Sequence, residues 1–270
     1  MSDDFVLTTQ QYVRAGLRRM PTRDWLLQGP DYSRAVEYPL AARLLEARAG
    51  HTLLDVGAGR RAEFSQHAAE AGLRVTAIDL RDDIGAELPP GTGIEVVSAD
   101  ATQLPFADET FDRIAAISTI EHIPDGDDRA MAELARVLKP GGRLVVSVPF
   151  NPLRSGTISK RGDVYGRSGE KVFFEHLYDE QLLQDRIVGP TGLVVSHRVN
   201  LAEPGAKLSR WYYEPRSQPL HALRFRLPWG WVMALLAPRF LRPADIAEYD
   251  GDDWIGSPAM IALTKPVAVA

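Results

Sequence analysis

The sequence predicts an α/β fold: a doubly wound, mostly parallel, Rossmann-like sheet of seven strands. The first reason is that short apolar runs alternate with segments of helical periodicity between residues 52 and 148. The second is that these runs are apolar almost throughout, as in strands that helices cover on both faces. Because ligands of such sheets bind where the strands end, functional residues are expected directly after each run.

The expected elements follow in order along the chain. Strands are predicted at residues 53–56, 73–78, 94–97, 111–118, 144–148, 192–196 and 259–263. Residues 151–169, rich in glycine, serine and basic residues, are expected to form a loop, and residues 178–187 a helix. The chain therefore divides into a helical cap, a cofactor-binding core, an insertion over the substrate, and a last strand with a tail, at residues 1–50, 51–200, 201–257 and 258–270.

Composition excludes several classes of function. The chain has 270 residues, 45% of them hydrophobic, and a formal net charge of -5, which argues against nucleic acid as a partner. The absence of cysteine excludes disulfides, thiolate metal ligands and cysteine nucleophiles. The first residues lack the features of a signal peptide, which predicts a cytoplasmic location. The longest apolar run, residues 227–241, contains prolines and an arginine and is too short to span a membrane.

The segment at residues 53–59, Leu-Leu-Asp-Val-Gly-Ala-Gly, predicts a strand, a tight turn and the start of a helix. Glycine at positions 57 and 59 permits positive φ and lets a ligand approach the backbone closely. The following helix points its free N–H groups at the same place. Asp79 ends the next strand, where a carboxylate accepts both hydroxyls of a ribose. The two strands together predict a nucleoside site.

Further segments make this pattern specific. Asp100 follows the third strand, residues 104–106 read Leu-Pro-Phe, residues 111–112 read Phe-Asp, and residues 138–142 read Leu-Lys-Pro-Gly-Gly. Over roughly residues 50–150 the chain resembles the class I S-adenosylmethionine-dependent methyltransferases, in particular the small-molecule, type 11-like branch. The resemblance implies S-adenosyl-L-methionine as cofactor and S-adenosyl-L-homocysteine as product. It also implies in-line methyl transfer to a small-molecule or lipid- or sugar-type acceptor.

The resemblance also implies a set of cofactor-binding residues at the strand ends: Asp55, Gly57, Ala58, Gly59, Asp79, Leu80, Asp100, Ala101, Ser118 and Glu121. In this set Asp55 would order the glycine turn and hold the methionine ammonium, and Asp79 would accept the ribose hydroxyls. Asp100 would accept the adenine amino group, and Leu80 would pack on the adenine ring. Glu121 would touch the cofactor or cap the next helix.

One position departs from the family pattern. The family usually has a third glycine where this chain has Arg61, preceded by Arg60. Cations in the first turn of a helix oppose its dipole at a cost of up to about 1 kcal/mol. The two arginines are expected to face either solvent or an acidic substrate.

Two other functions fit parts of the pattern. Gly57-x-Gly59-x-x-Ala62 matches the dinucleotide fingerprint, which keeps an NAD(P)- or flavin-dependent oxidoreductase as an alternative. Against it, Asp55 lies just before the turn, where its charge would repel a pyrophosphate. The second alternative is a non-catalytic scaffold that binds the cofactor without turnover.

Two histidines are candidates for a general base, which the reaction needs only if the acceptor must lose a proton. His122 lies beside Glu121 after the fourth strand, and His176 follows the fifth. The other histidines have no partner at metal-ligand spacing, so no metal is predicted.

The aromatic-rich insertion is expected to line the acceptor pocket, pack as a small core or form a dimer contact. Residues 227–241, flanked by arginines, are a candidate for membrane-surface contact. Oxygen, nitrogen and carbon acceptors all fit this scaffold, and the oligomeric state stays open.

Overall fold

The computed structural model describes residues 4–18, 30–161, 171–203, 229–246 and 258–267. Its main sheet has eight strands in the order β3-β2-β1-β4-β5-β10-β8-β9. The strands are β1 Thr52–Val56, β2 Arg74–Asp79, β3 Glu95–Ser98, β4 Phe111–Ile117, β5 Leu138–Pro149, β8 Val194–Ala202, β9 Arg242–Pro243 and β10 Pro258–Thr264. The strands from β3 to β5 pair in parallel, and β10 is antiparallel to both its neighbours, β5 and β8. The seven predicted strands are confirmed, and the two-residue β9 is an addition.

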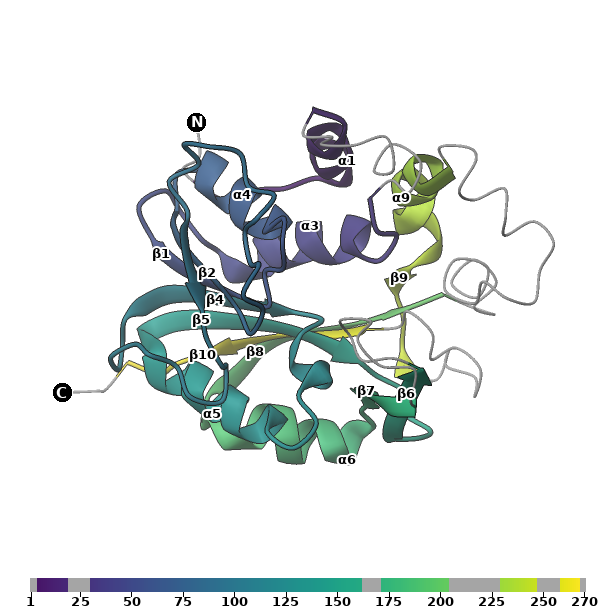
Figure 1. Ribbon diagram of the computed structural model, residues 1–270. Helices are drawn as coiled ribbons and strands as arrows, with labels where there is room; N and C mark the ends of the chain where they lie inside the picture. The colour runs from purple at the N-terminus through teal and green to yellow at the C-terminus, as the bar shows by residue number, and fades with distance from the viewer. Residues whose placement is uncertain (1–3, 19–29, 162–170, 204–228, 247–257, 268–270) are drawn as a thin grey trace.

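Helices cover both faces of the sheet (Figure 1). One face carries α1 Thr9–Arg18, α3 Arg34–Leu45, α4 Glu63–Glu70 and α9 Trp229–Phe240. The other carries α5 Asp127–Val137 and α6 Glu180–Leu183, which continues as the π-helical turn η2 Gln184–Val188. Side chains alternate along each strand, so Leu53 packs into the first layer and Leu54 into the second, both fully buried. This two-sided burial is why the strands read as unbroken apolar runs.

The predicted loop at residues 151–169 is wrong in part. Residues 156–161 form β6 Gly156–Arg161, which pairs antiparallel with β7 Lys171–Leu177 in a separate two-stranded sheet. The described side chains of β6 are mostly exposed, so backbone pairing holds this strand and no apolar alternation marks it in the sequence. The sixth predicted strand also runs on, as β8, to Ala202, two residues into the predicted insertion.

Most of the insertion, including the aromatic cluster at residues 211–213, lies outside the described residues. Its described helix α9 packs Trp231 and Met233 against α1 and α3. No helix among the described residues is long and apolar enough to cross a membrane. The exposed side of α9 carries apolar residues such as Leu235 and Phe240. Membrane-surface contact and a cytoplasmic location stay predictions.

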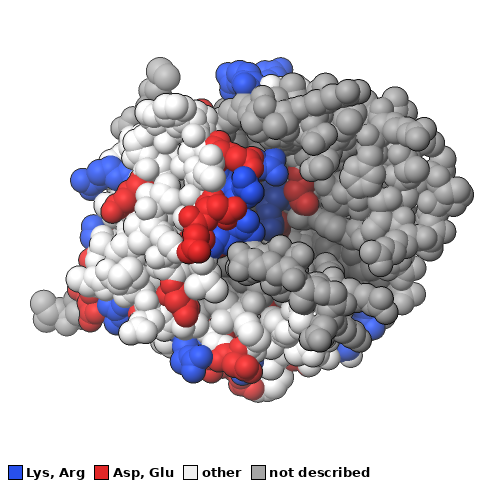
Figure 2. Space-filling model, in the orientation of Figure 1, with Lys and Arg blue, Asp and Glu red and all other residues white. Residues whose placement is uncertain are grey.

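On the face shown in Figure 2, basic and acidic side chains lie next to one another, and no broad basic patch covers the described residues.

Candidate functional site

A cavity of about 490 Å³ lies at the carboxyl ends of β1, β2 and β4. Loops that follow these strands and β3 form its walls. The sequence-predicted residues in its lining are Gly57, Asp79, Leu80, Asp100, Ala101, Ser118 and His122. The volume lies within the range of small-molecule and cofactor sites. The strand-end rule therefore predicted where this cavity lies.

The glycine turn after β1 combines two different requirements for glycine. At Gly57 (φ +74°) an added Cβ would overlap the side chain of Thr119, whose hydroxyl donates to the Val56 carbonyl at 3.0 Å. At Gly59 (φ +67°) an added Cβ would meet open space, so only the left-handed backbone requires glycine there. The turn is thus held against the tip of β4, and its outer part leaves room for a ligand.

Two carboxylates are fixed by backbone N–H groups beside this turn. Asp79 accepts from Gly59 N through Oδ2 and from Arg81 N through Oδ1, both at 3.0 Å. Asp100 accepts from the backbone N and the hydroxyl of Thr102, both at 2.8 Å and both through Oδ1. Each carboxylate keeps lone pairs beyond those used here. Both side chains are therefore pre-oriented acceptors at the edge of the cavity.

Asp55 has a different environment from the other two carboxylates. It is buried inside the fold, is not among the lining residues, and accepts a 2.6 Å hydrogen bond from the Ser65 hydroxyl of α4. Burial raises the pKa of its carboxyl to about 7, against the lowering effect of the bonds from Ser65. Asp55 therefore fastens β1 to α4 behind the turn. Ala58 is also outside the lining and packs with a small apolar cluster.

Arg60 and Arg61 form ion pairs with this chain's own acids. Arg60 lies 3.1 Å from Glu87 and 3.3 Å from Asp83, in the loop after β2. Arg61 lies 3.3 Å from Glu63 in the first turn of α4. These half-exposed arginines tie the glycine turn to the loop after β2. The sequence suggests that they face either solvent or an acidic substrate, and pairing with the chain's own acids is not among these expectations. Ala62, with φ +43°, adopts the left-handed conformation at the helix start.

A polar network that the sequence analysis missed joins the cap to the strand tips. The Ser118 hydroxyl donates to Glu37 at 3.1 Å and accepts from Arg34 at 2.6 Å. The Ser147 hydroxyl donates to the same Glu37 oxygen at 2.9 Å. Ser118 has φ +45°, a rare conformation for serine that the network holds. The available signal was Glu37 itself, a carboxylate on the apolar face of a predicted helix.

The two histidine candidates lie in different surroundings. His122 lines the cavity, and its Nδ1 is 2.7 Å from the Phe174 carbonyl oxygen. His176 is buried between the rings of Phe173 and Tyr178, with Nε2 3.0 Å from the Pro124 carbonyl oxygen, and is not among the lining residues. The geometry thus brings only His122 to the cavity.

Glu121 is fully enclosed next to His122. Burial raises the pKa of its carboxyl well above the usual value, and the charge of Glu175 on β7 raises it further. Like Asp55, Glu121 is behind the cavity wall and not among the residues that line it.

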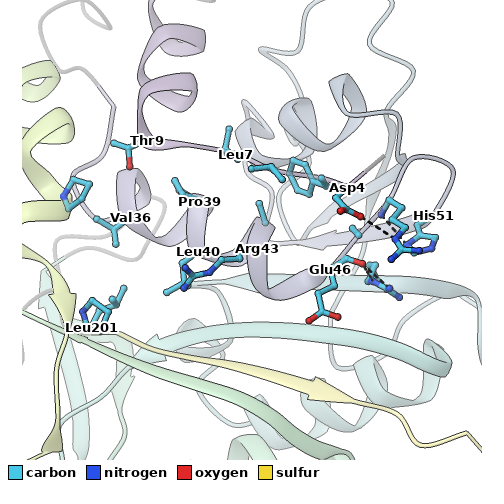
Figure 3. A pocket seen from close by; sticks show the side chains of 18 of the residues that line it. Asp4, Leu7, Thr9, Val36, Pro39, Leu40, Arg43, Glu46, His51 and Leu201 are labelled. Atoms are coloured by element: carbon cyan, nitrogen blue, oxygen red, sulfur yellow. Dashed lines mark hydrogen bonds and ion pairs between the residues drawn. The ribbon is translucent and has the colours of Figure 1, made fainter. Parts of the chain in front are cut away.

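A second cavity, of about 880 Å³, lies away from these residues (Figure 3). Leu7 of the N-terminal segment, Leu40 of α3 and Leu201 of β8 line it. It also reaches His51, which precedes β1, and Arg113 near the start of β4. It therefore extends to the amino ends of the central strands, opposite the edge where parallel sheets bind ligands. The smaller cavity is the better candidate for the chemistry.

Comparisons with known proteins agree with this location. The sequence pattern of the family described as "Methyltransferase domain" matches residues 54–146. A demethylmenaquinone methyltransferase of Thermobifida fusca is 40% identical over 119 residues, which cover 40% of this chain and 50% of that protein. Residues 54–146 thus match a methyltransferase domain.

Two further relatives match this chain over segments of similar length. Methyltransferase GfsG of Streptomyces halstedii is 39% identical over 112 residues, covering 38% of this chain and 39% of GfsG. The C-methyltransferase UbiE of Klebsiella pneumoniae is 38% identical over 128 residues, covering 44% of this chain and 50% of UbiE. The chain thus spans half or less of the length of these relatives.

Solved structures extend the fold comparison to nearly the whole chain. The [4+2]-cyclase SpnF has a TM-score of 0.57 and 20% identity, covering 99% of this chain and 100% of that one. An S-adenosylmethionine-dependent methyltransferase from Methanosarcina mazei has a TM-score of 0.55 and 18% identity, covering 85% of this chain and 98% of that one. These similarities show the Rossmann-like fold. A cyclase among them illustrates that this fold does not fix the reaction.

Proposed function

We propose that this protein is an enzyme that transfers a methyl group from S-adenosylmethionine to a small-molecule acceptor. The observation that carries the proposal is that Gly57, Asp79 and Asp100 line one cavity within the methyltransferase domain. A nucleoside with an amino acid tail needs two fixed acceptors for its ribose and base, and an open turn for its tail. The chain offers these groups together, whereas nothing in the comparisons favours an oxidoreductase or a scaffold.

The residues fit the cofactor in three places. Asp79 keeps lone pairs for the ribose hydroxyls, and the Asp100 oxygen not bonded to Thr102 is available to the adenine amino group. Leu80 is 64% exposed and lines the cavity, so an adenine ring would cover an apolar side chain that otherwise faces solvent. Gly57 lines the cavity at the glycine turn, where the methionine part would lie, whereas Gly59 is not among the lining residues. When bound, the cofactor supplies an electrophilic methyl group on its sulfonium.

The acceptor side of the site is formed by the tip of β4 and the residues after it. Ser118 and His122 line the cavity there, and Ser118 is held by a hydrogen bond that it accepts from Arg34 and one that it donates to Glu37. Holding an acceptor in line with the methyl group accounts for much of the acceleration in such reactions. The Nδ1 contact with a backbone carbonyl fixes the ring of His122 at the cavity wall.

The names of the relatives support a quinone-type acceptor. Two of them methylate precursors of menaquinone or ubiquinone according to their names. The match covers 50% of each of those two proteins. We include lipid- and sugar-type acceptors in the proposal, with the insertion at residues 201–257 and the cap at residues 1–50 as the parts that select among them.

Calorimetric titration with S-adenosylmethionine, S-adenosylhomocysteine, NAD and NADP tests the cofactor. We expect binding of the two sulfur compounds only, weakened by about 1.5–3 kcal/mol in Asp79→Ala, because a charged acceptor of two hydroxyls is lost. Asp82→Ala is the matched control, since Asp82 is exposed in the same loop. Binding of a nicotinamide cofactor instead would overturn the proposal. Mass spectrometry of candidate quinols for a gain of one methyl group then distinguishes methyl transfer from a reaction of the cyclase kind.

A further inference from the structure

Three potential metal ligands meet behind the acceptor end of the cavity. Glu121 and His122 belong to the turn η1 Ile120–His122 after β4, and Glu175 belongs to β7. One ligand atom from each side chain lies within 4.8 Å of the other two. The hairpin β6–β7 therefore adds to the site a carboxylate that is distant in sequence from the other two residues.

One oxygen of the buried Glu121 carboxyl lacks a hydrogen-bond partner within the described part of the chain. Its side chain is 2% exposed, and Oε2 has no hydrogen-bond partner among the described residues. Its other oxygen lies 4.0 Å from Nε2 of His122, beyond hydrogen-bond distance. Burying a carboxylate without a partner costs several kcal/mol, by order of magnitude. A cation bound at Oε2 would give this enclosed oxygen the partner that it lacks among the described residues.

His122 has the tautomer of a metal ligand. A carbonyl oxygen only accepts, so the 2.7 Å contact of Nδ1 with the Phe174 carbonyl puts the ring proton on Nδ1. The lone pair of Nε2 then faces Glu121. Histidines that bind metals commonly donate their second nitrogen to a carbonyl in this way, which fixes both the ring orientation and the tautomer.

We propose that Glu121, His122 and Glu175 together bind a divalent cation. One imidazole and two carboxylates, with no thiolate, suit Zn²⁺ and Mn²⁺. Two atoms that each lie about 2.1 Å from a tetrahedral zinc ion are about 3.4 Å apart, so the three ligands must approach by roughly 1 Å. Glu175 is partly exposed on a two-stranded sheet, whereas Glu121 is enclosed.

The cation would have a role in the reaction because His122 also lines the cofactor cavity. With three protein ligands, an ion keeps open coordination positions, and an oxygen atom of the acceptor fits one of them. Such an ion lowers the pKa of a bound hydroxyl, whose proton then leaves to water before the oxygen takes the methyl group. This role rests on the proposed methyl transfer, whereas cation binding itself does not. It favours acceptors that are methylated on a hydroxyl oxygen.

Titration of chelator-treated, untagged protein with Zn²⁺, and with Mn²⁺ followed by electron paramagnetic resonance, tests the site. We expect one site in the wild type and binding at least roughly tenfold weaker in Glu121→Gln and Glu175→Gln. Glu70→Gln is the matched control, because Glu70 also lies 4.0 Å from a histidine, His67, outside the cluster, and should leave binding unchanged. Glu175→Gln affects a partly exposed residue, so its fold is expected to stay intact.

The outcomes separate this inference from the proposed function. Equal cation affinity in the wild type and both cluster variants, or no binding by the wild type, would overturn the cation site. Binding of S-adenosylhomocysteine is measured on the same samples. A protein that binds the cation at these residues but binds no S-adenosylhomocysteine would retain the cation site and refute the proposed methyl transfer.

Discussion

The hydroxyl of Ser118 at the tip of β4 donates a 3.1 Å hydrogen bond to Glu37 of α3, across the boundary between the helical cap and the sheet. Glu37 is 1% exposed and also accepts from Ser147 and forms an ion pair with Arg34. One carboxylate thus holds the cap helix against the tips of two strands. The shape of the candidate acceptor end depends on this residue.

Replacing Glu37 tests that dependence. We expect Glu37→Ala to lower the free energy of unfolding by about 3–5 kcal/mol, because it breaks a buried ion pair and removes the acceptor of two hydroxyls. Glu37→Gln keeps one acceptor oxygen and should lower it less. Urea unfolding measures both. Glu46→Gln, which affects an exposed carboxylate 2.7 Å from Arg143, is the control and should change stability by less than about 1 kcal/mol. Equal effects of all three substitutions would refute the structural role of Glu37.

The two glycines of the turn should respond differently to a change in Thr119. Gly57→Ala places a methyl group on the Thr119 side chain, so Thr119→Ala should recover part of the stability lost in Gly57→Ala. Gly59→Ala meets no neighbouring atom and should cost about 1–2 kcal/mol from its left-handed backbone alone. Thr119→Ala should give no recovery there. Denaturant unfolding of the single and double variants measures the coupling, and a similar coupling at both glycines would contradict the described packing.

Asp55 should make the protein less stable as pH rises through neutrality. Burial raises the pKa of its carboxyl in the fold to about 7 from the ordinary value of 3.8, so between these two pH values the folded chain holds a proton that the unfolded chain has released. Unfolding then releases a proton, and the free energy of unfolding falls with rising pH. At about 1.4 kcal/mol per pH unit, the loss reaches up to about 4 kcal/mol above pH 7.

Asp55→Asn isolates this contribution to stability. Asparagine still accepts the hydrogen bond from Ser65 but does not ionise, so its stability should vary less between pH 5 and pH 8 than that of the wild type. Urea unfolding of both proteins at the two pH values measures the difference. Parallel pH profiles would mean that Asp55 has an ordinary pKa in the fold.

The sequence was sufficient to predict the central sheet and where the site lies on it. The apolar runs that end at Asp55 and Asp79 are local patterns, and parallel pairing places their carboxyl ends at the same edge. The cofactor and the family also follow from residues close together in the chain. Such features follow from the spacing of apolar residues along a segment, which the local sequence shows directly.

The remaining features depend on contacts between distant segments. Glu37 meets Ser118 only because α3 packs on the sheet, and Glu175 meets Glu121 only because β7 folds back against η1. Glu37 alone stands out in the sequence, but nothing local indicates the partner of either residue. Asp55 illustrates the reverse case, since the sequence identified it but its side chain turns toward Ser65, behind the cavity wall. Tertiary packing decides which way such a side chain points.

The position of β10 also affects how the protein forms during synthesis. This strand pairs with β5 on one side and β8 on the other, along nearly its whole length. Until residues 258–264 have left the ribosome, those two neighbours each present an unpaired edge to the surroundings. Open edges of this kind recruit other chains. Protection by chaperones during translation, or a pause before release, would therefore matter more for this chain than for a sheet whose last strand lies at its border.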